Sequence, residues 1–282
     1  MTATLFDSRN CELGEGVLWH PEREQFFWFD ILGNRLLSRL GEEALDWPFA
    51  EHVSAAGWVD EDSLLVASET GLYRFDLASG RRDLVCALEA DEPRTRSNDG
   101  RADPQGGFWI GTMGKRAEPG LGAIYRYYRG ALERLYPGIS IPNAICFSPD
   151  GRHAYLADTP TRRILRQALD VQGWPKGPAE TFVDLNAEGL NPDGAVVDAE
   201  GGLWNAQWGA ARVARYRPDG RFDRAVAVPG LHASCPGFGG PGLTDMLVTT
   251  AREAIAAPDA DQGRTYIVAA GIAGLPEPRI IL

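Results

Sequence analysis

Six turn segments recur along this 282-residue chain at intervals of 40 to 50 residues. They are His20-Pro21, Asp60-Glu61, Asp103-Pro104, Ser148-Pro149, Asp198-Ala199 and Gly239-Gly240. Around the turns the chain repeats one pattern: a short apolar stretch, the turn, a second apolar stretch, and a third with an aromatic or aliphatic pair. A period of about 40–45 residues that holds four strands is typical of a β-propeller blade.

The third unit shows the pattern clearly. Its turn occupies residues 101–107, and apolar stretches follow at 108–111 and 123–127. Pro and Gly suit such turns, because Pro fixes φ and Gly accepts positive φ. No window of about 12 residues has persistent 3.6-residue amphipathic spacing, so long helices are not expected.

These features predict an all-β fold: a six-bladed β-propeller with four-stranded antiparallel blades around a central channel. Residues 1–282 are expected to form one domain, since six units leave no room for another. Ring closure removes exposed sheet edges, so residues 4–6 are predicted to pair with the last blade near residues 265–268. An open sandwich with similar turns is the alternative, and the regular unit length disfavours it.

One position in each unit, five residues before the turn, is occupied by a small, amide or acidic residue. The set is Glu15, Ala55, Asn98, Asn143, Asp193 and Ser234. The innermost strands of a propeller run along its channel, so equivalent positions on them surround one axis. Carboxylate and carboxamide oxygens meeting there suit Ca²⁺, Mg²⁺ or Mn²⁺. Zinc is less favoured, since His and Cys ligands are absent.

Each of these residues also has an ordinary structural interpretation. Glu15 fits an exposed turn, Asn143 fits a loop cap after a proline, and Asp193 fits a turn between Pro192 and Gly194. Their coincidence at one repeat position favours a shared site.

Composition and the absence of familiar motifs exclude several functional classes. The net charge of −11 disfavours a nucleic-acid surface and an anionic membrane. The sequence lacks a GxSxG elbow, a phosphate loop, a dinucleotide fingerprint and an HExxH pair. No signal peptide or long apolar run is evident, and the four cysteines stand alone, so a cytoplasmic protein with reduced thiols is expected. His20, at a turn, is expected to be exposed.

Seven segments, in order and spanning nearly the whole chain, carry a resemblance to a known family. They are residues 13–19 (LGEGVLW), 96–100 (RSNDG), 111–113 (GTM), 142–143 (PN), 148–151 (SPDG), 192–194 (PDG) and 235–240 (CPGFGG). With them the chain resembles the SMP-30/gluconolactonase family, which includes regucalcin and bacterial sugar-lactone hydrolases.

The resemblance implies one divalent metal ion, Ca, Mn, Mg or Zn, held by Glu15, Asn143 and Asp193. It also implies that Arg96 and Asn98 contact substrate, together with a Glu in the loop after Gly-Thr-Met. Glu118 is the only candidate in that loop, although its spacing from Met113 differs from that of regucalcin.

The activity implied is hydrolysis of a sugar lactone, an aldonolactone or aldarolactone, to the sugar acid. The metal would polarise the carbonyl, and Asp193 would be the catalytic general base as well as a ligand. Arg96 alternatively fits a surface salt bridge, and Asn98 a strand-entry cap. A non-catalytic, regucalcin-like calcium-binding propeller and a phosphotriesterase-type propeller hydrolase are the competing functions. No protein partner can be inferred.

Four further residues are expected near the pocket. Phe238 and Trp208 are candidates for its wall, with core packing as the competing interpretation for both. Ala55 and Ser234 are expected to keep space open above the ion.

Overall fold

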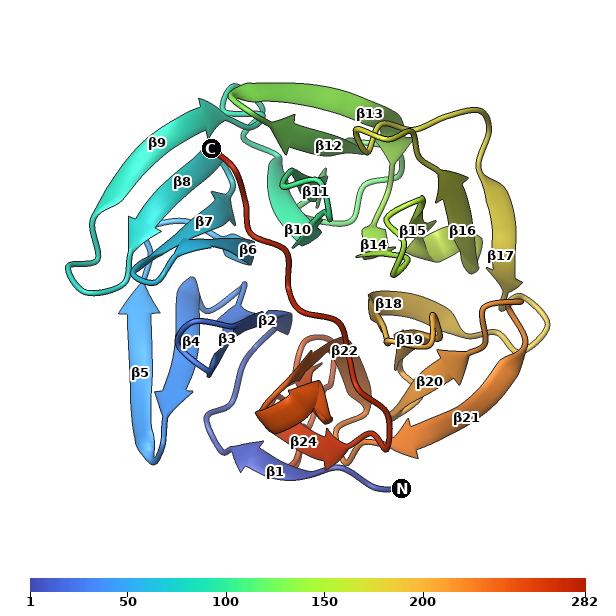
Figure 1. Ribbon diagram of the computed structural model, residues 1–282. Helices are drawn as coiled ribbons and strands as arrows, with labels where there is room; N and C mark the ends of the chain where they lie inside the picture. The colour runs from blue at the N-terminus through green and yellow to red at the C-terminus, as the bar shows by residue number, and fades with distance from the viewer.

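The chain forms a ring of six β-sheets around a central channel (Figure 1). The computed structural model describes all 282 residues, with 24 strands and two short 3-10 helices, η1 (Thr159–Thr161) and η2 (Pro241–Leu243). Each sheet has four strands, and every pairing between them is antiparallel. The predicted six-bladed β-propeller is therefore confirmed. Neither helix is long and apolar enough to cross a membrane.

The first three blades follow one another along the chain, each running from its inner to its outer strand. The first contains β2 (Gly14–His20), β3 (Gln25–Asp30), β4 (Arg35–Leu40) and β5 (Glu43–Pro48). The second contains β6 (Val53–Asp60), β7 (Ser63–Ser68), β8 (Gly71–Asp76) and β9 (Arg82–Ala87). The third contains β10 (Thr95–Ala102), β11 (Phe108–Gly114), β12 (Gly122–Tyr128) and β13 (Ala131–Ile139).

The other three blades complete the ring. The fourth contains β14 (Pro142–Phe147), β15 (His153–Asp158), β16 (Arg163–Ala168) and β17 (Glu180–Asp184). The fifth contains β18 (Asn191–Val197), β19 (Leu203–Trp208), β20 (Arg212–Tyr216) and β21 (Phe222–Ala227). The sixth contains β22 (His232–Gly239), β23 (Asp245–Ala251), β24 (Thr265–Ala269) and, as its outermost strand, β1 (Thr4–Asp7).

The two ends of the chain close the ring within the sixth blade. Leu5 of β1 pairs with Tyr266 of β24, and Thr4 pairs with Ile267. The predicted pairing is confirmed. The outer edge of the last blade is thus covered by the first strand, which leaves no gap in the ring.

Large apolar side chains on the second strand of the blades fill the space between neighbouring sheets. Trp28 of β3, Trp109 of β11 and Trp204 of β19 are fully buried. Each tryptophan removes roughly 150–250 Å² of surface from water, so these layers contribute strongly to the stability of the ring. They hold the inner strands at fixed positions around the channel.

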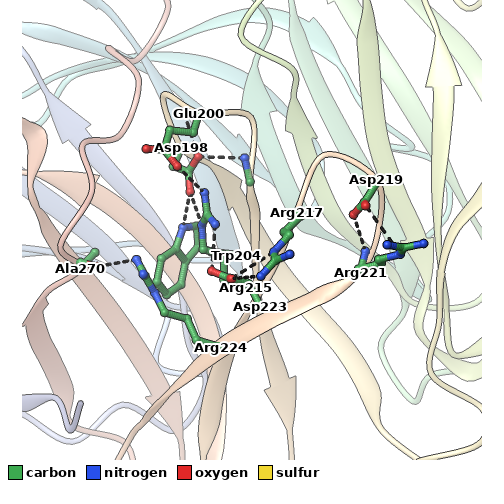
Figure 2. A network of polar contacts seen from close by, with 11 residues as sticks. Asp198, Glu200, Trp204, Arg215, Arg217, Asp219, Arg221, Asp223, Arg224 and Ala270 are labelled. Carbon is green, nitrogen blue, oxygen red and sulfur yellow. Dashed lines mark hydrogen bonds and ion pairs between the residues drawn. The ribbon is translucent and has the colours of Figure 1, made fainter.

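The aspartates at the repeat turns anchor the blades through buried hydrogen bonds. In the third blade, Asp103 accepts from Nε of Arg126 at 2.7 Å, and both side chains are fully buried. In the fifth, one carboxylate oxygen of Asp198 accepts from Nε of Arg215 at 2.7 Å and from Nε1 of Trp204 at 2.8 Å (Figure 2). Because both buried charges are paired, these turns tie the first strand of a blade to the third.

The turn at His20 departs from the expectation of exposure. His20 is fully buried, and its Nε2 lies 3.0 Å from the carbonyl oxygen of Asp60 in the next blade. The expectation was wrong, because the His20 side chain packs against the neighbouring blade while the turn residues after it, such as Glu22 and Glu24, are exposed.

The C-terminal segment, residues 270–282, crosses the ring over one end of the channel (Figure 1). Glu277 of this segment forms an ion pair with Arg101 of β10. The amide of Ile280 donates to the carbonyl of Trp58 at 2.9 Å, and the Ile280 side chain is buried against the second and third blades. The segment covers the end at which the inner strands finish, so the candidate site lies toward the opposite end.

Candidate functional site

A cavity of about 400 Å³ opens at the end of the ring where β2, β14 and β18 begin. Its lining includes Glu15, Arg96, Asn98, Asn143 and Asp193. Six residues were predicted to bind the metal or the substrate. The structure brings five of them together from four different blades, and Glu118 is the exception.

All six inner strands carry a β-bulge at nearly the same level. The pairing register shifts directly after Glu15, Asn143 and Pro192, and within two residues of the repeat position in the other three inner strands. A bulge bends the strand and redirects a side chain. In four of the six inner strands the residue at this repeat position, Glu15, Asn98, Asn143 or Asp193, lines the cavity.

Glu15 and Asp193 place two buried carboxylates at the cavity with almost no compensation from the protein. Glu15 accepts one hydrogen bond, from the backbone amide of Gly16 at 3.2 Å, the backbone amide of Gly194 is the one group that lowers the pKa of Asp193, and neither carboxylate has a cation within ion-pair distance. Burial, followed by the charge of Asp99, raises the pKa of Glu15 to about 8. Burial and the charge of Glu15 raise the pKa of Asp193 well above its ordinary value.

Arg96, Asn98 and Asn143 are linked to one another by hydrogen bonds. Nη1 of Arg96 donates to Oδ1 of Asn98 at 2.8 Å. Nδ2 of Asn98 donates to the carbonyl of Pro142 at 2.9 Å and to Oδ1 of Asn143 at 3.3 Å. Nη1 of Arg96 also donates to the carbonyl of Ser97 at 2.9 Å, whereas the N–H groups on Nε and Nη2 make no hydrogen bond within the protein and are free to bind a ligand.

This donor set fits a hard divalent cation. Two carboxylates and the carbonyl oxygen of Asn143 would offer oxygen ligands, and no His or Cys lines the cavity. A cation between Glu15 and Asp193 would supply the positive charge that these buried carboxylates lack. The structure contains no cluster of three or more His, Cys, Asp or Glu side chains, and in the predicted set the third ligand is an amide.

Glu118 lies apart from the other predicted residues. It is half-buried in the loop after β11, does not line the cavity, and accepts from the backbone amide of Arg116 at 3.0 Å. Its neighbours Lys115 and Arg116 line the cavity instead, and Nζ of Lys115 lies 2.5 Å from the carboxylate of Glu69. The role in substrate contact that the resemblance implies for Glu118 stays a prediction.

Of the four further residues expected near the pocket, only Trp208 lines the cavity. Trp208, at the end of β19, lines the cavity, and its ring stacks on that of His232 with centroids 4.1 Å apart and an interplanar angle of 9°. Phe238 is buried in the core between the fifth and sixth blades. Ala55 and Ser234 are fully buried and do not line the cavity.

Several cavity residues were missed in the sequence because they lie at a second repeat position. This position is the end of the second strand of a blade, where Lys115 follows β11, Thr159 follows β15 and Glu253 follows β23. Trp208 occupies the equivalent place in the fifth blade. Counting from the end of each second apolar stretch would have located this set.

Comparisons with known proteins identify relatives over nearly the whole chain. The sequence profile described as "SMP-30/Gluconolactonase/LRE-like region" matches residues 13–252. A Rhizobium meliloti protein is 40% identical over 276 residues, which are 95% of this chain and 93% of that protein. L-arabinolactonase of Azospirillum brasilense is 38% identical over 98% of this chain and 94% of its own.

A solved structure is similar over the whole chain. It is described as a calcium-binding protein, regucalcin, from Agrobacterium tumefaciens, and is 39% identical to this chain. The two align with a TM-score of 0.96 over 100% of this chain and 98% of that one.

Proposed function

The chain belongs to the SMP-30/gluconolactonase family. We propose that it hydrolyses a sugar lactone to the corresponding sugar acid. The substrate would be an aldonolactone or an aldarolactone. The observation that carries the proposal is the pair of uncompensated carboxylates, Glu15 and Asp193, beside the free guanidinium donors of Arg96 in one cavity. Similarity to L-arabinolactonase over nearly the full length supports it.

Glu15, Asn143 and Asp193 would hold one divalent cation. Their oxygen donors suit Ca²⁺, Mg²⁺ or Mn²⁺, and Zn²⁺ is the fourth candidate. When bound, the cation supplies Lewis-acid polarisation of the lactone carbonyl and charge for the developing oxyanion. The calcium-binding description of the Agrobacterium relative supports a cation here.

Asp193 is proposed as the general base. Its carboxylate takes a proton from the attacking water as the new carbon–oxygen bond forms. The ring ester bond then breaks, and the proton passes from Asp193 to the leaving ring oxygen. Ionisation of Asp193 at neutral pH requires positive charge nearby, because burial alone favours the protonated form.

Arg96 and Trp208 are proposed to hold the substrate. The free N–H groups of Arg96 can bind sugar hydroxyls or a second carboxylate, and a planar guanidinium binds a carboxylate through two parallel bonds. The part of the Trp208 ring that lines the cavity can pack against the C–H face of a sugar ring. Asn98 would act together with Arg96, because Oδ1 of Asn98 accepts a hydrogen bond from the Arg96 guanidinium.

Acid release from a panel of lactones tests the proposal. Protein treated with chelator is assayed with glucono-, galactono-, xylono- and arabinonolactone after addition of Ca²⁺, Mn²⁺, Mg²⁺ or Zn²⁺ in turn. We expect turnover of at least one lactone that depends on added cation. Cation binding without hydrolysis of any lactone would instead support the non-catalytic calcium-binding function, and hydrolysis of aryl phosphotriesters alone would support the phosphotriesterase-type function.

A further inference from the structure

Thr159 lies at the edge of the cavity in a rigid segment. It follows β15 as the first residue of η1, and its amide donates to the carbonyl of Ile141 at 3.0 Å, next to the start of β14. Pro160 comes directly after it and restricts the backbone further. The hydroxyl of Thr159 is therefore presented to the cavity from a fixed backbone position.

The Thr159 hydroxyl fixes the orientation of the Asn143 amide. Its oxygen donates to the carbonyl of Pro192 at 2.7 Å and accepts from Nδ2 of Asn143 at 2.9 Å. A hydroxyl has one proton, and the Pro192 carbonyl can only accept. The Asn143 group that faces Thr159 must therefore be the NH₂, which directs its carbonyl oxygen away from Thr159 and toward Asn98.

These bonds belong to one chain that runs across three blades in a single direction. Arg96 donates to Asn98, Asn98 to Asn143, Asn143 to Thr159, and Thr159 to the backbone just before Asp193. Consecutive bonds of the same direction polarise one another, and a positive charge stands at the donor end. The chain connects the proposed substrate-binding arginine with two of the proposed metal ligands.

We propose that Thr159 is a positioning residue that keeps the carbonyl oxygen of Asn143 available as a metal ligand. This inference rests on the proposed metal site of the same cavity. Without the hydroxyl, only the 3.3 Å bond from Nδ2 of Asn98 orients the Asn143 amide, so Asn143 can more easily rotate by half a turn and present its NH₂, which cannot bind a cation. Loss of residues that orient metal ligands typically weakens metal binding by about 10–100-fold.

Calorimetric titration of chelator-treated protein with Mn²⁺ tests the inference. Thr159→Val keeps the shape of the side chain and removes the hydroxyl, so Mn²⁺ affinity should fall by about 10–100-fold. Thr159→Ser keeps the hydroxyl and should bind within about threefold of the wild type. Thr161→Val is the matched control, since the exposed hydroxyl of Thr161 bonds only to the carbonyl of Asp158, the residue before η1; the Mn²⁺ affinity of this variant should not change.

A second readout separates positioning from loss of structure. At saturating Mn²⁺, Thr159→Val should recover most of the wild-type kcat, and far-ultraviolet circular dichroism should match that of the wild type. Unchanged Mn²⁺ affinity in Thr159→Val, or equal weakening in Thr159→Ser, would overturn the inference, as would a wild-type protein that binds no Mn²⁺. Failure of every lactone to react would contradict the proposed activity alone, because the titration uses no lactone.

Discussion

Gly16 and Ala144 have the same left-handed backbone conformation at equivalent points of β2 and β14, with φ of 60° and 59°. Each directly follows a proposed metal ligand and lies inside the bulge of its strand. A Cβ added at Gly16 would overlap the carbonyl oxygen of Ser54 and lie 2.8 Å from the ring of Phe29. The methyl group of Ala144, in contrast, is accommodated in the core. Contacts, not the backbone angle, thus require glycine at position 16.

Gly16→Ala should therefore lower the free energy of unfolding by about 1–3 kcal/mol, the usual cost of forcing an extra methyl into a packed interior. Ala144→Gly is the matched change and should cost less than about 1 kcal/mol, because relief of left-handed strain offsets the loss of a buried methyl. Urea unfolding of both variants measures the difference. Equal destabilisation by the two changes would show that the contacts at Gly16 are not decisive.

Asp193→Asn should keep the fold and lower lactone turnover by at least about 10²-fold, since it removes the proposed general base. It also removes one anionic ligand, so added Ca²⁺ or Mn²⁺ should raise the melting temperature of the wild type but hardly that of the variant. Acid release measures the loss of turnover, and thermal unfolding measures the stabilisation by the cation. Both measurements are made once with chelator and once with added cation. Full activity in Asp193→Asn would remove this residue from its assigned role.

His20 should make stability depend on pH below 6.5, the ordinary pKa of a histidine ring. Its Nδ1 accepts from the amide of Arg23 at 3.3 Å, while Nε2 faces the carbonyl of Asp60, an arrangement that suits the neutral ring. Burial is the main cause that lowers the pKa of His20 below its ordinary value of 6.5; the charge of Arg23 lowers it further, and that of Glu22 acts against this. The stabilisation is thus complete above pH 6.5 and is lost as pH falls through the depressed pKa, because the unfolded chain takes up the proton first.

Comparison with His20→Gln isolates this contribution. Glutamine can donate to Asp60 and accept from Arg23 without titrating in this range. Urea unfolding from pH 7 to pH 5 should show a steeper loss of stability in the wild type than in His20→Gln, because only the wild-type chain carries an imidazole at position 20 that takes up a proton on unfolding. Parallel pH profiles would mean that His20 accepts a proton in the folded protein without cost.

The fold could be predicted from the sequence because every unit repeats the same local information. Turn residues and apolar stretches recur every 40 to 50 residues, and the N-terminal segment supplies the fourth strand of the last blade. The same count located Glu15, Asn98, Asn143 and Asp193, because a bulge lies at nearly the same level in each inner strand.

The rest of the site depends on contacts that a repeat does not contain. Ala55 and Ser234 occupy the same repeat position as the proposed ligands yet lie in the core. Glu253 follows its strand by two residues and Lys115 follows its strand by one, so loop length disguises their common place. The Glu118 side chain accepts from the backbone amide of Arg116 in its own loop. This orientation depends on the backbone path of the loop, which the sequence pattern does not specify.

Trp208→Ala should raise KM for the lactone, with a fall in kcat/KM of roughly tenfold, since about 1.4 kcal/mol of binding corresponds to a factor of ten. Trp208→Phe should retain most of the affinity, because a ring still faces the cavity. Phe238→Leu, which changes an aromatic side chain in the core, is the control and should leave KM unchanged. Steady-state kinetics on the lactone that reacts fastest in the panel measure these KM values. An unaltered KM in Trp208→Ala would exclude stacking of the substrate on this ring.

The ion pair between Arg101 and Glu277 should be needed for stability and not for catalysis. The two side chains are only 11% and 7% exposed, and Glu277 is the nearest opposite charge that holds the pKa of Arg101 high. Glu277→Ala would leave the guanidinium buried without a partner, at a cost of about 3–5 kcal/mol in unfolding free energy.

The exposed pair of Arg81 and Asp83 provides the control for this change. Its side chains are 72% and 55% exposed, so Asp83→Ala should cost less than about 1 kcal/mol. Because residues 270–282 cover the end of the channel opposite the cavity, the folded Glu277→Ala protein should keep wild-type kcat and KM. Urea unfolding measures the predicted loss of stability. Lactone kinetics, at a temperature where both variants are folded, measure whether kcat and KM are unchanged. A loss of kcat in folded Glu277→Ala would show that the C-terminal segment also influences the site through the inner strand β10, which carries Arg96, Asn98 and Arg101.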